Sequence, residues 1–191
     1  MIIVGIDPGI ATTGYGVIEK IKKGNKIECL DYGVIKTSSL LDKGERLKII
    51  NKEIDSLIKR YKPEAMAIER LYFFKNAKTI IPVSQAKGVI LFTIAKNKIP
   101  VYEFTPLQVK MTITGFGRAE KRQVQEMIKI IFKLDNIPKP DDAADALGIA
   151  MCLATINNCY LSKEKGLTDW FIRTYNDSCI NNLIRLIKVD R

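Results

Sequence analysis

The chain has 191 residues, of which 47% are apolar, and its 31 Lys and Arg residues outnumber its 21 Asp and Glu residues to give a net charge of +10. This length suits one compact domain with a short appendage, and the basic excess indicates a polyanionic partner, either nucleic acid or an anionic membrane surface. Histidine is absent, which excludes histidine triads, histidine-ligated zinc and histidine general bases. Hydrolytic chemistry in this chain must therefore come from carboxylates, lysines or hydroxyls.

The first half of the chain predicts three strands, a helix and a fourth strand. Apolar runs at 2–6, 14–19 and 26–35 are joined by short turn-forming connections, which is typical of an antiparallel meander. Apolar residues recur at helical spacing within 42–61. A short buried strand is expected at 65–68.

The second half predicts mainly helices. A long helix is expected over 77–97, in which Pro82 must delay the start or introduce a kink. The elements expected after it are a strand at 101–104, a brief helix opened by Thr105-Pro106, a mobile loop at 114–118, a basic amphipathic helix at 119–132 and a helix of small residues at 141–155. This order predicts an α/β domain with a mixed five-stranded sheet over residues 1–156, followed by a C-terminal extension of uncertain structure over 157–191.

The location of the protein is expected to be cytoplasmic. No apolar run reaches the roughly 18 residues needed to span a bilayer, so no membrane partner is expected. The N-terminus shows neither a basic flank nor a small-residue cleavage site. The four cysteines are scattered without short paired spacings, which argues against a zinc site and favours reduced thiols.

Acidic residues stand at the ends of apolar elements rather than on charged faces. Asp7 follows the first strand and Glu69 follows the fourth, so the two meet at one sheet edge if these strands are neighbours. Asp142 and Asp145 are three residues apart and share one face of the last helix. Two carboxylates about 4 Å apart repel by roughly 4 kcal/mol at an effective dielectric near 20. Four of them together therefore need protons, solvent or divalent cations such as Mg²⁺ or Mn²⁺, which prefer oxygen ligands.

Each of these residues also has a plain structural interpretation. Asp7 can set the turn with the Pro-Gly that follows it, Glu69 can be a solvated strand end, and Asp141 or Asp142 can be an ordinary helix N-cap. Local patterns alone leave these alternatives open.

The carboxylates lie within longer motifs that follow one another along the chain. These motifs are Gly5-Ile6-Asp7-Pro8-Gly9, Ala67-Ile68-Glu69, Lys75-Asn76-Ala77, Gln85-Ala86-Lys87-Gly88, Gln108-Val109-Lys110, Ala119-Glu120-Lys121 and Asp142-Ala143-Ala144-Asp145-Ala146-Leu147. Together they resemble the RuvC family of Holliday-junction resolvases. The resemblance is collinear over residues 1 to about 156 and rests on the whole combination, since a lone Asp-Pro-Gly is a weak signal.

The resemblance implies a ribonuclease H-like fold and a crossover junction endodeoxyribonuclease, which nicks two opposing strands of four-way DNA junctions in recombination and repair. It implies that Asp7, Glu69, Asp142 and Asp145 are the catalytic metal ligands, holding two Mg²⁺ ions per active site, with Mn²⁺ able to substitute.

The resemblance also implies partners and DNA contacts. A homodimer is expected, with the helix after Lys75 at the interface, and a branch-migration complex is conceivable as a further partner. The candidate DNA-binding residues are Tyr72, Lys75, Lys110, Arg118 and Lys121, with Tyr72 able to stack on a base. The alternatives are a core aromatic for Tyr72, beside Phe73 and Phe74, and solvated surface charges for the lysines.

Three other functions remain to be separated from this one by experiment. They are a nuclease for RNA–DNA hybrids or unbranched DNA, a non-catalytic junction-binding protein, and an actin-like ATPase. The third needs two lobes to enclose its nucleotide, and this chain has room for one.

Overall fold

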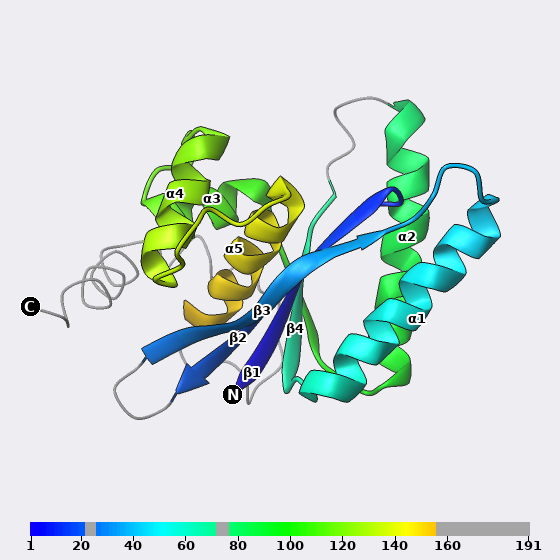
Figure 1. Cartoon of the computed structure of the whole chain (residues 1–191), viewed down its shortest axis with the longest axis horizontal. Helices are drawn as coiled ribbons and strands as arrows, with labels where there is room; N and C mark the ends of the chain where they lie inside the picture. Colours follow the sequence, from blue (N-terminus) through cyan, green and yellow to red (C-terminus); the bar gives the residue numbers. More distant parts are fainter. Residues whose placement is uncertain (22–25, 72–76, 156–191) are drawn as a thin grey trace, which may run out of the picture.

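A mixed β-sheet forms the centre of the molecule (Figure 1). The computed structural model describes residues 1–21, 26–71 and 77–155, so the expected extension at 157–191 lies outside the described residues. The strands are β1 (Ile2–Asp7), β2 (Thr12–Ile21), β3 (Lys26–Lys36), β4 (Ala65–Glu69) and β5 (Val101–Phe104), in the spatial order β3-β2-β1-β4-β5. β1, β2 and β3 form the antiparallel meander, whereas β4 and β5 run parallel to β1. The expected mixed five-stranded sheet is confirmed.

Five helices are described: α1 (Lys43–Tyr61), α2 (Ala77–Lys96), α3 (Pro106–Thr114), α4 (Lys121–Ile131) and α5 (Asp141–Thr155). The helix starts follow from capping residues. The Asp42 carboxylate accepts the Glu45 N–H at 3.0 Å, and Thr105 forms a capping box with Gln108. α2 begins at Ala77 and passes through Pro82, so the proline does not delay its start. Among the described helices, none is long and apolar enough to cross a membrane.

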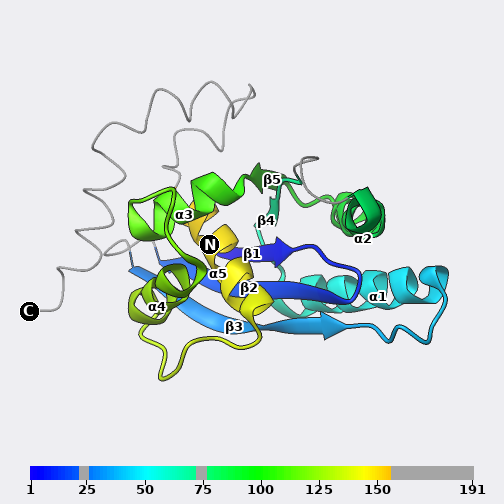
Figure 2. The same cartoon turned by 90° about the horizontal axis from the view of Figure 1, so that it is seen from above.

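The helices cover the two faces of the sheet. α1 and α2 lie on one face, and α5 lies on the other with α3 and α4 outside it (Figures 1 and 2). Alternation along β1 divides its side chains between two buried clusters, since Ile3 packs with the α5 side and Val4 with the α1 side.

α5 approaches the sheet unusually closely because three glycines face it. A Cβ atom added at Gly5 would lie 2.2 Å from the Ala146 carbonyl oxygen, and one at Gly16 would lie 2.8 Å from the Leu147 nitrogen. A Cβ at Gly14 would lie 2.0 Å from the Asp142 carbonyl oxygen. The missing side chains of β1 and β2 therefore let the α5 backbone pack directly against the strands.

Candidate active site

Asp7 and Glu69 stand next to each other at the ends of two neighbouring parallel strands. β1 pairs with β4 with Ile6 opposite Ile68, so the residue that follows each of them leaves the sheet at the same edge. A hydrogen bond joins the two carboxyl groups. The two strands are therefore neighbours, which is the condition under which their acidic ends were expected to meet, and their pairing brings together acidic residues 62 positions apart.

α5 brings the other two carboxylates to the same edge. Gly14 of β2 is the register partner of Asp7, and it is also the glycine that the Asp142 backbone approaches most closely. Because Asp145 follows one turn later on α5, both helix carboxylates lie on the Asp7 side of the sheet. Their charges, together with that of Glu69, act directly on Asp7.

The electrostatics of Asp7 show how crowded this edge is. Burial is the largest effect, and the neighbouring Glu69, Asp145 and Asp142 carboxylates add to it, so that the pKa of Asp7 rises to about 8. Burial and the Asp145 charge also raise the pKa of Glu69, although the hydrogen bond with Asp7 and the Lys87 charge oppose that rise. Without a nearby cation, Asp7 would therefore hold a proton at neutral pH, whereas a cation at this edge would favour its ionised form.

Lys121, at the start of α4, is exposed and forms ion pairs with two carboxylates of this region. Its ammonium is 3.2 Å from Asp145 Oδ2 and 3.4 Å from Asp141 Oδ2. Burial opposes the charge of Lys121, but the two carboxylates outweigh it and raise its pKa. In turn, burial raises the pKa of Asp145 and Lys121 counteracts that rise. The expected DNA contact is thus also a positive charge at the rim of the acidic cluster.

Lys87 is a member of this region that we did not select from the sequence. Its side chain is 11% exposed, and its ammonium donates to the Glu69 carbonyl oxygen at 3.0 Å and lies 3.0 Å from Glu103 Oε2. Glu103 in turn lies 3.6 Å from Arg70 Nε. Lys87 therefore ties α2 and β5 to the main chain at Glu69.

A signal for Lys87 was present in the helical spacing. The buried positions of α2 include Ala86, Ile90 and Ile94, and Lys87 shares a helix face with Ile90 and Ile94, which follow it by three and seven residues. A lysine on an apolar helix face must find a buried partner, so the pattern predicts an ion pair. Which carboxylate it pairs with is not visible in the spacing.

The other candidate DNA-binding residues divide into two groups. Tyr72 and Lys75 lie outside the described residues. Lys110 is half-buried on α3, and Arg118 is exposed in the connection from α3 to α4. Arg118 precedes Lys121 by three positions in the sequence.

The four carboxylates suit a hard divalent cation in donor chemistry and in charge. Carboxylate oxygens are the ligands that such ions prefer, and the raised pKa of Asp7 marks a place where added positive charge is favourable. Within the described residues, no three acidic or cysteine side chains are grouped closely enough to hold one ion as they stand. Binding would therefore require side-chain rotation, which the half-exposed Asp142 and Asp145 permit.

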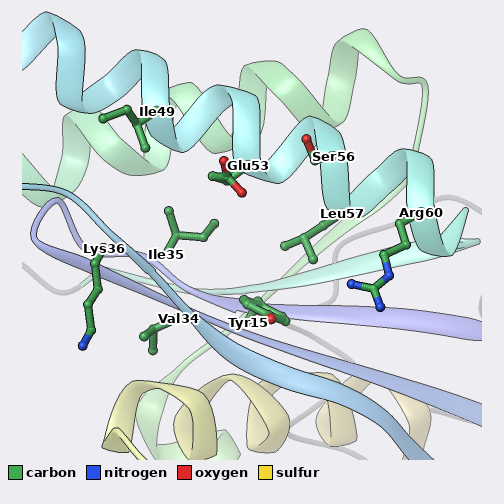
Figure 3. A pocket seen from close by; sticks show the side chains of 9 residues that line it. All are labelled: Tyr15, Val34, Ile35, Lys36, Ile49, Glu53, Ser56, Leu57 and Arg60. Atoms are coloured by element: carbon green, nitrogen blue, oxygen red, sulfur yellow. The ribbon is translucent and has the colours of Figure 1, made fainter.

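A cavity of about 350 Å³ lies on the face of the sheet that α5 does not cover, between α1 and the strands β2 and β3 (Figure 3). Tyr15 lines it from β2, and Glu53 and Arg60 line it from α1. None of the candidate site residues borders it. The cavity is therefore separate from the carboxylates.

Comparison with known proteins identifies the family. The family model described as crossover junction endodeoxyribonuclease RuvC matches residues 3–153. The chain belongs to the RuvC family. A curated member from Caldicellulosiruptor saccharolyticus is 51% identical over 164 residues, which cover 86% of this chain and 98% of that protein. The family expected from the motifs is confirmed, and with it the assignment to the Holliday-junction resolvases.

Solved structures agree with this assignment. The Thermus thermophilus RuvC structure matches with a TM-score of 0.73 and 36% identity, covering 80% of this chain and 92% of that chain. T. thermophilus RuvC in complex with a Holliday junction substrate matches with a TM-score of 0.71 and 32% identity, over the same shares. The ribonuclease H-like fold is thereby confirmed. Nucleases of this family depend on metal ions.

Proposed function

We propose that this chain resolves four-way DNA junctions by hydrolysing one phosphodiester in each of two opposing strands, with Asp7, Glu69, Asp142 and Asp145 holding Mg²⁺. The observation that supports this most directly is the mutual electrostatic influence of carboxylates from β1, β4 and α5 around Asp7. A cluster of this kind destabilises the fold unless positive charge offsets it. Bound divalent cations would supply that positive charge.

Each carboxylate has a distinct position in this proposal. Asp7 is central, because all three others act on it, and it would hold divalent cations together with them. Glu69 would bind from β4, while Asp142 and Asp145 would bind from the first turns of α5. Divalent ions at such a site supply an activated water and neutralise the charge on the departing oxygen. We expect Mn²⁺ to substitute for Mg²⁺, since both favour oxygen ligands.

The surrounding cations fit a DNA track that leads to these carboxylates. Lys121 is held at the rim by Asp141 and Asp145, within reach of a phosphate that entered the cluster. Arg118 is exposed close by in sequence, and Lys110 lies on the preceding helix. We propose that these three residues bind the DNA backbone, with Tyr72 and Lys75 contributing from the segment between β4 and α2. The net charge of +10 predicts binding that weakens steeply with salt.

A homodimer would place two such sites on one junction, because a two-fold axis matches two opposing strands. α2 offers a surface for this contact. Ile81 and Phe92 are large, exposed apolar side chains three turns apart on this helix, and exposed Gln85 and Gly88 lie on the same stripe between them. We propose that this stripe meets its copy in a second chain. Phe92→Glu should then give a monomer in analytical ultracentrifugation that binds junctions weakly and cuts them poorly.

The decisive experiment compares substrates and a single substitution. Wild type should cut a synthetic four-way junction in Mg²⁺, should not cut it in EDTA, and should leave linear duplex and RNA–DNA hybrid largely intact. Asp7→Asn should bind the junction with unchanged affinity and fail to cut it. Persistent cutting by Asp7→Asn would overturn the proposed metal site, and equal cutting of linear duplex would point to an unspecific nuclease.

A further inference from the structure

The connection between α3 and α4 carries an aromatic ring that faces solvent. Phe116 is 58% exposed, whereas its neighbours Gly115 and Gly117 are partly buried. A Cβ atom added at Gly117 would lie 2.5 Å from Leu107 Cδ1 and 3.3 Å from Met111 Sδ, so the loop backbone rests directly on α3. Ala119, three positions later, is buried at 2% exposure. The loop is therefore attached to the body of the protein while its largest side chain projects away from it.

Hydrogen bonds hold the backbone of Phe116 on both sides. The Thr114 hydroxyl accepts the Phe116 N–H at 3.1 Å, and it can donate to the carbonyl oxygen of Lys110 at 2.8 Å or of Phe116 at 3.0 Å. The Ala119 N–H donates to the same Phe116 carbonyl at 3.0 Å. Gly115 makes the turn possible with a φ of 71°, which strongly favours glycine. The loop expected to be mobile is instead fixed by these contacts.

The position of this ring connects it with the candidate active site. Five residues after Phe116, the Lys121 ammonium lies 3.2 Å from Asp145. Arg118 stands between them and is exposed. An exposed aromatic that precedes an exposed arginine by two residues and a lysine of the acidic cluster by five has the composition of a single-strand binding platform, in which cations hold the backbone and the ring stacks on a base. An interface for another protein would be poorly served here, because charged residues are depleted from the centre of such interfaces.

We propose that Phe116 is a DNA-contact residue that stacks on a nucleobase unpaired near the crossover, while Arg118 binds an adjacent phosphate. This inference rests on the proposed function, since it needs a junction in the site. The fixed backbone favours tight binding, because a ring on a fixed backbone loses little conformational entropy when a base stacks on it. Phe116 would thus bind an unpaired base of the DNA. This stacking contact would add to the phosphate contacts proposed for the lysines.

The test compares Phe116→Ala with Phe116→Trp and with Ile130→Ala as a matched control. Ile130 lies near the end of α4 that is farther from the loop, and it is also 58% exposed. Ile130→Ala therefore removes a similar area of exposed apolar surface without changing the proposed contact. Affinity for a synthetic four-way junction is measured in an Asp7→Asn background, which prevents cutting. Phe116→Ala should weaken binding by roughly 5- to 150-fold, the range for loss of one stacked base. Phe116→Trp should retain binding, and Ile130→Ala should match the parent protein.

Salt dependence separates stacking from charge. Phe116→Ala should leave the slope of log affinity against log salt unchanged, because no phosphate contact is lost, whereas Arg118→Ala should make it shallower by about one unit. A 2-aminopurine at the crossover should lose fluorescence on binding to the parent protein and keep it with Phe116→Ala. If Phe116→Ala binds and cuts like Ile130→Ala, the inference fails while wild-type junction cutting still stands. If wild type itself does not cut junctions, the proposed function fails.

Discussion

Gly14→Ala tests whether the close contact between β2 and α5 sets the geometry of the site. A Cβ atom at position 14 would lie 2.0 Å from the Asp142 carbonyl oxygen, whereas ordinary contact begins at 3.4 Å. The backbone of α5 at Asp142 would therefore have to retreat by the difference, about 1.4 Å. Overpacking of this kind costs about 1–3 kcal/mol of stability. A displacement near 1 Å of reacting groups costs roughly 10²-fold in rate, and Asp142 and Asp145 both lie on the displaced turn.

The expected result is a folded protein that binds the junction but cuts it roughly 100-fold more slowly in a single-turnover assay. Gly148→Ala is the matched control on the same helix. Its Cβ would meet only side-chain atoms, the nearest being Val109 Cγ1 at 3.0 Å, and these can yield. It should lower stability modestly and leave cutting within a few-fold of wild type. Equal cutting rates for Gly14→Ala and wild type would refute the idea that this contact positions the carboxylates.

Three further predictions concern stability. Lys87→Met should lower the free energy of unfolding, measured in urea, by about 1.5–3 kcal/mol, because the Glu69 carbonyl loses a charged donor. Lys87→Arg should recover part of the lost stability. An unchanged free energy of unfolding in Lys87→Met would contradict the role given to Lys87. Asp7→Asn should raise the melting temperature in EDTA at neutral pH, since it removes the cost of burying an acid whose pKa the fold raises to about 8. It should also abolish the rise in melting temperature that Mg²⁺ gives to wild type by binding only the folded state. Desolvation and the 2.5 Å hydrogen bond to Asp31 raise the pKa of Tyr61 to about 12, above its ordinary value near 10. The stability that the neutral Tyr61 hydroxyl adds is therefore complete below pH 10 and is lost as the pH rises through 12. The difference in urea midpoint between wild type and Tyr61→Phe should shrink across that interval, and a constant difference would show that Tyr61 does not titrate as stated.

The strands and helices were largely predictable because their signals are local. Asp42 and Thr105 each precede a helical pattern and do cap it. The strand order was predictable only in part, since sequence suggests that β1 and β4 are neighbours but does not show which residue pairs with which. The structure supplies that register by placing Ile6 opposite Ile68. Register matters here, because a shift of one residue would move Asp7 to the other face of the sheet.

The expectations that differ from the structure depended on contacts between distant segments. The loop at 114–118 is rich in glycine, a composition typical of flexible connections, but Thr114 and the packing of Gly117 on α3 hold it. Lys121 was expected by resemblance near the DNA and the active site, but nothing in its own helix shows that Asp145 lies 3.2 Å away. Lys87 was named only within a family motif and not as a site residue, since its partner Glu103 lies on a separate strand. Such roles follow from tertiary contacts that short motifs do not encode.

The small residues of the site motifs and the carboxylates of the site depend on the same geometry. Asp142 and Asp145 can act on Asp7 only if the α5 backbone lies close to β1 and β2, and every large side chain between them would push it away. Gly5, Gly14 and Gly16 clear the sheet side, and alanines such as Ala146 clear the helix side. The glycines and alanines are thus as necessary to the chemistry as the acids. Their substitution should therefore impair cutting even where every carboxylate is retained.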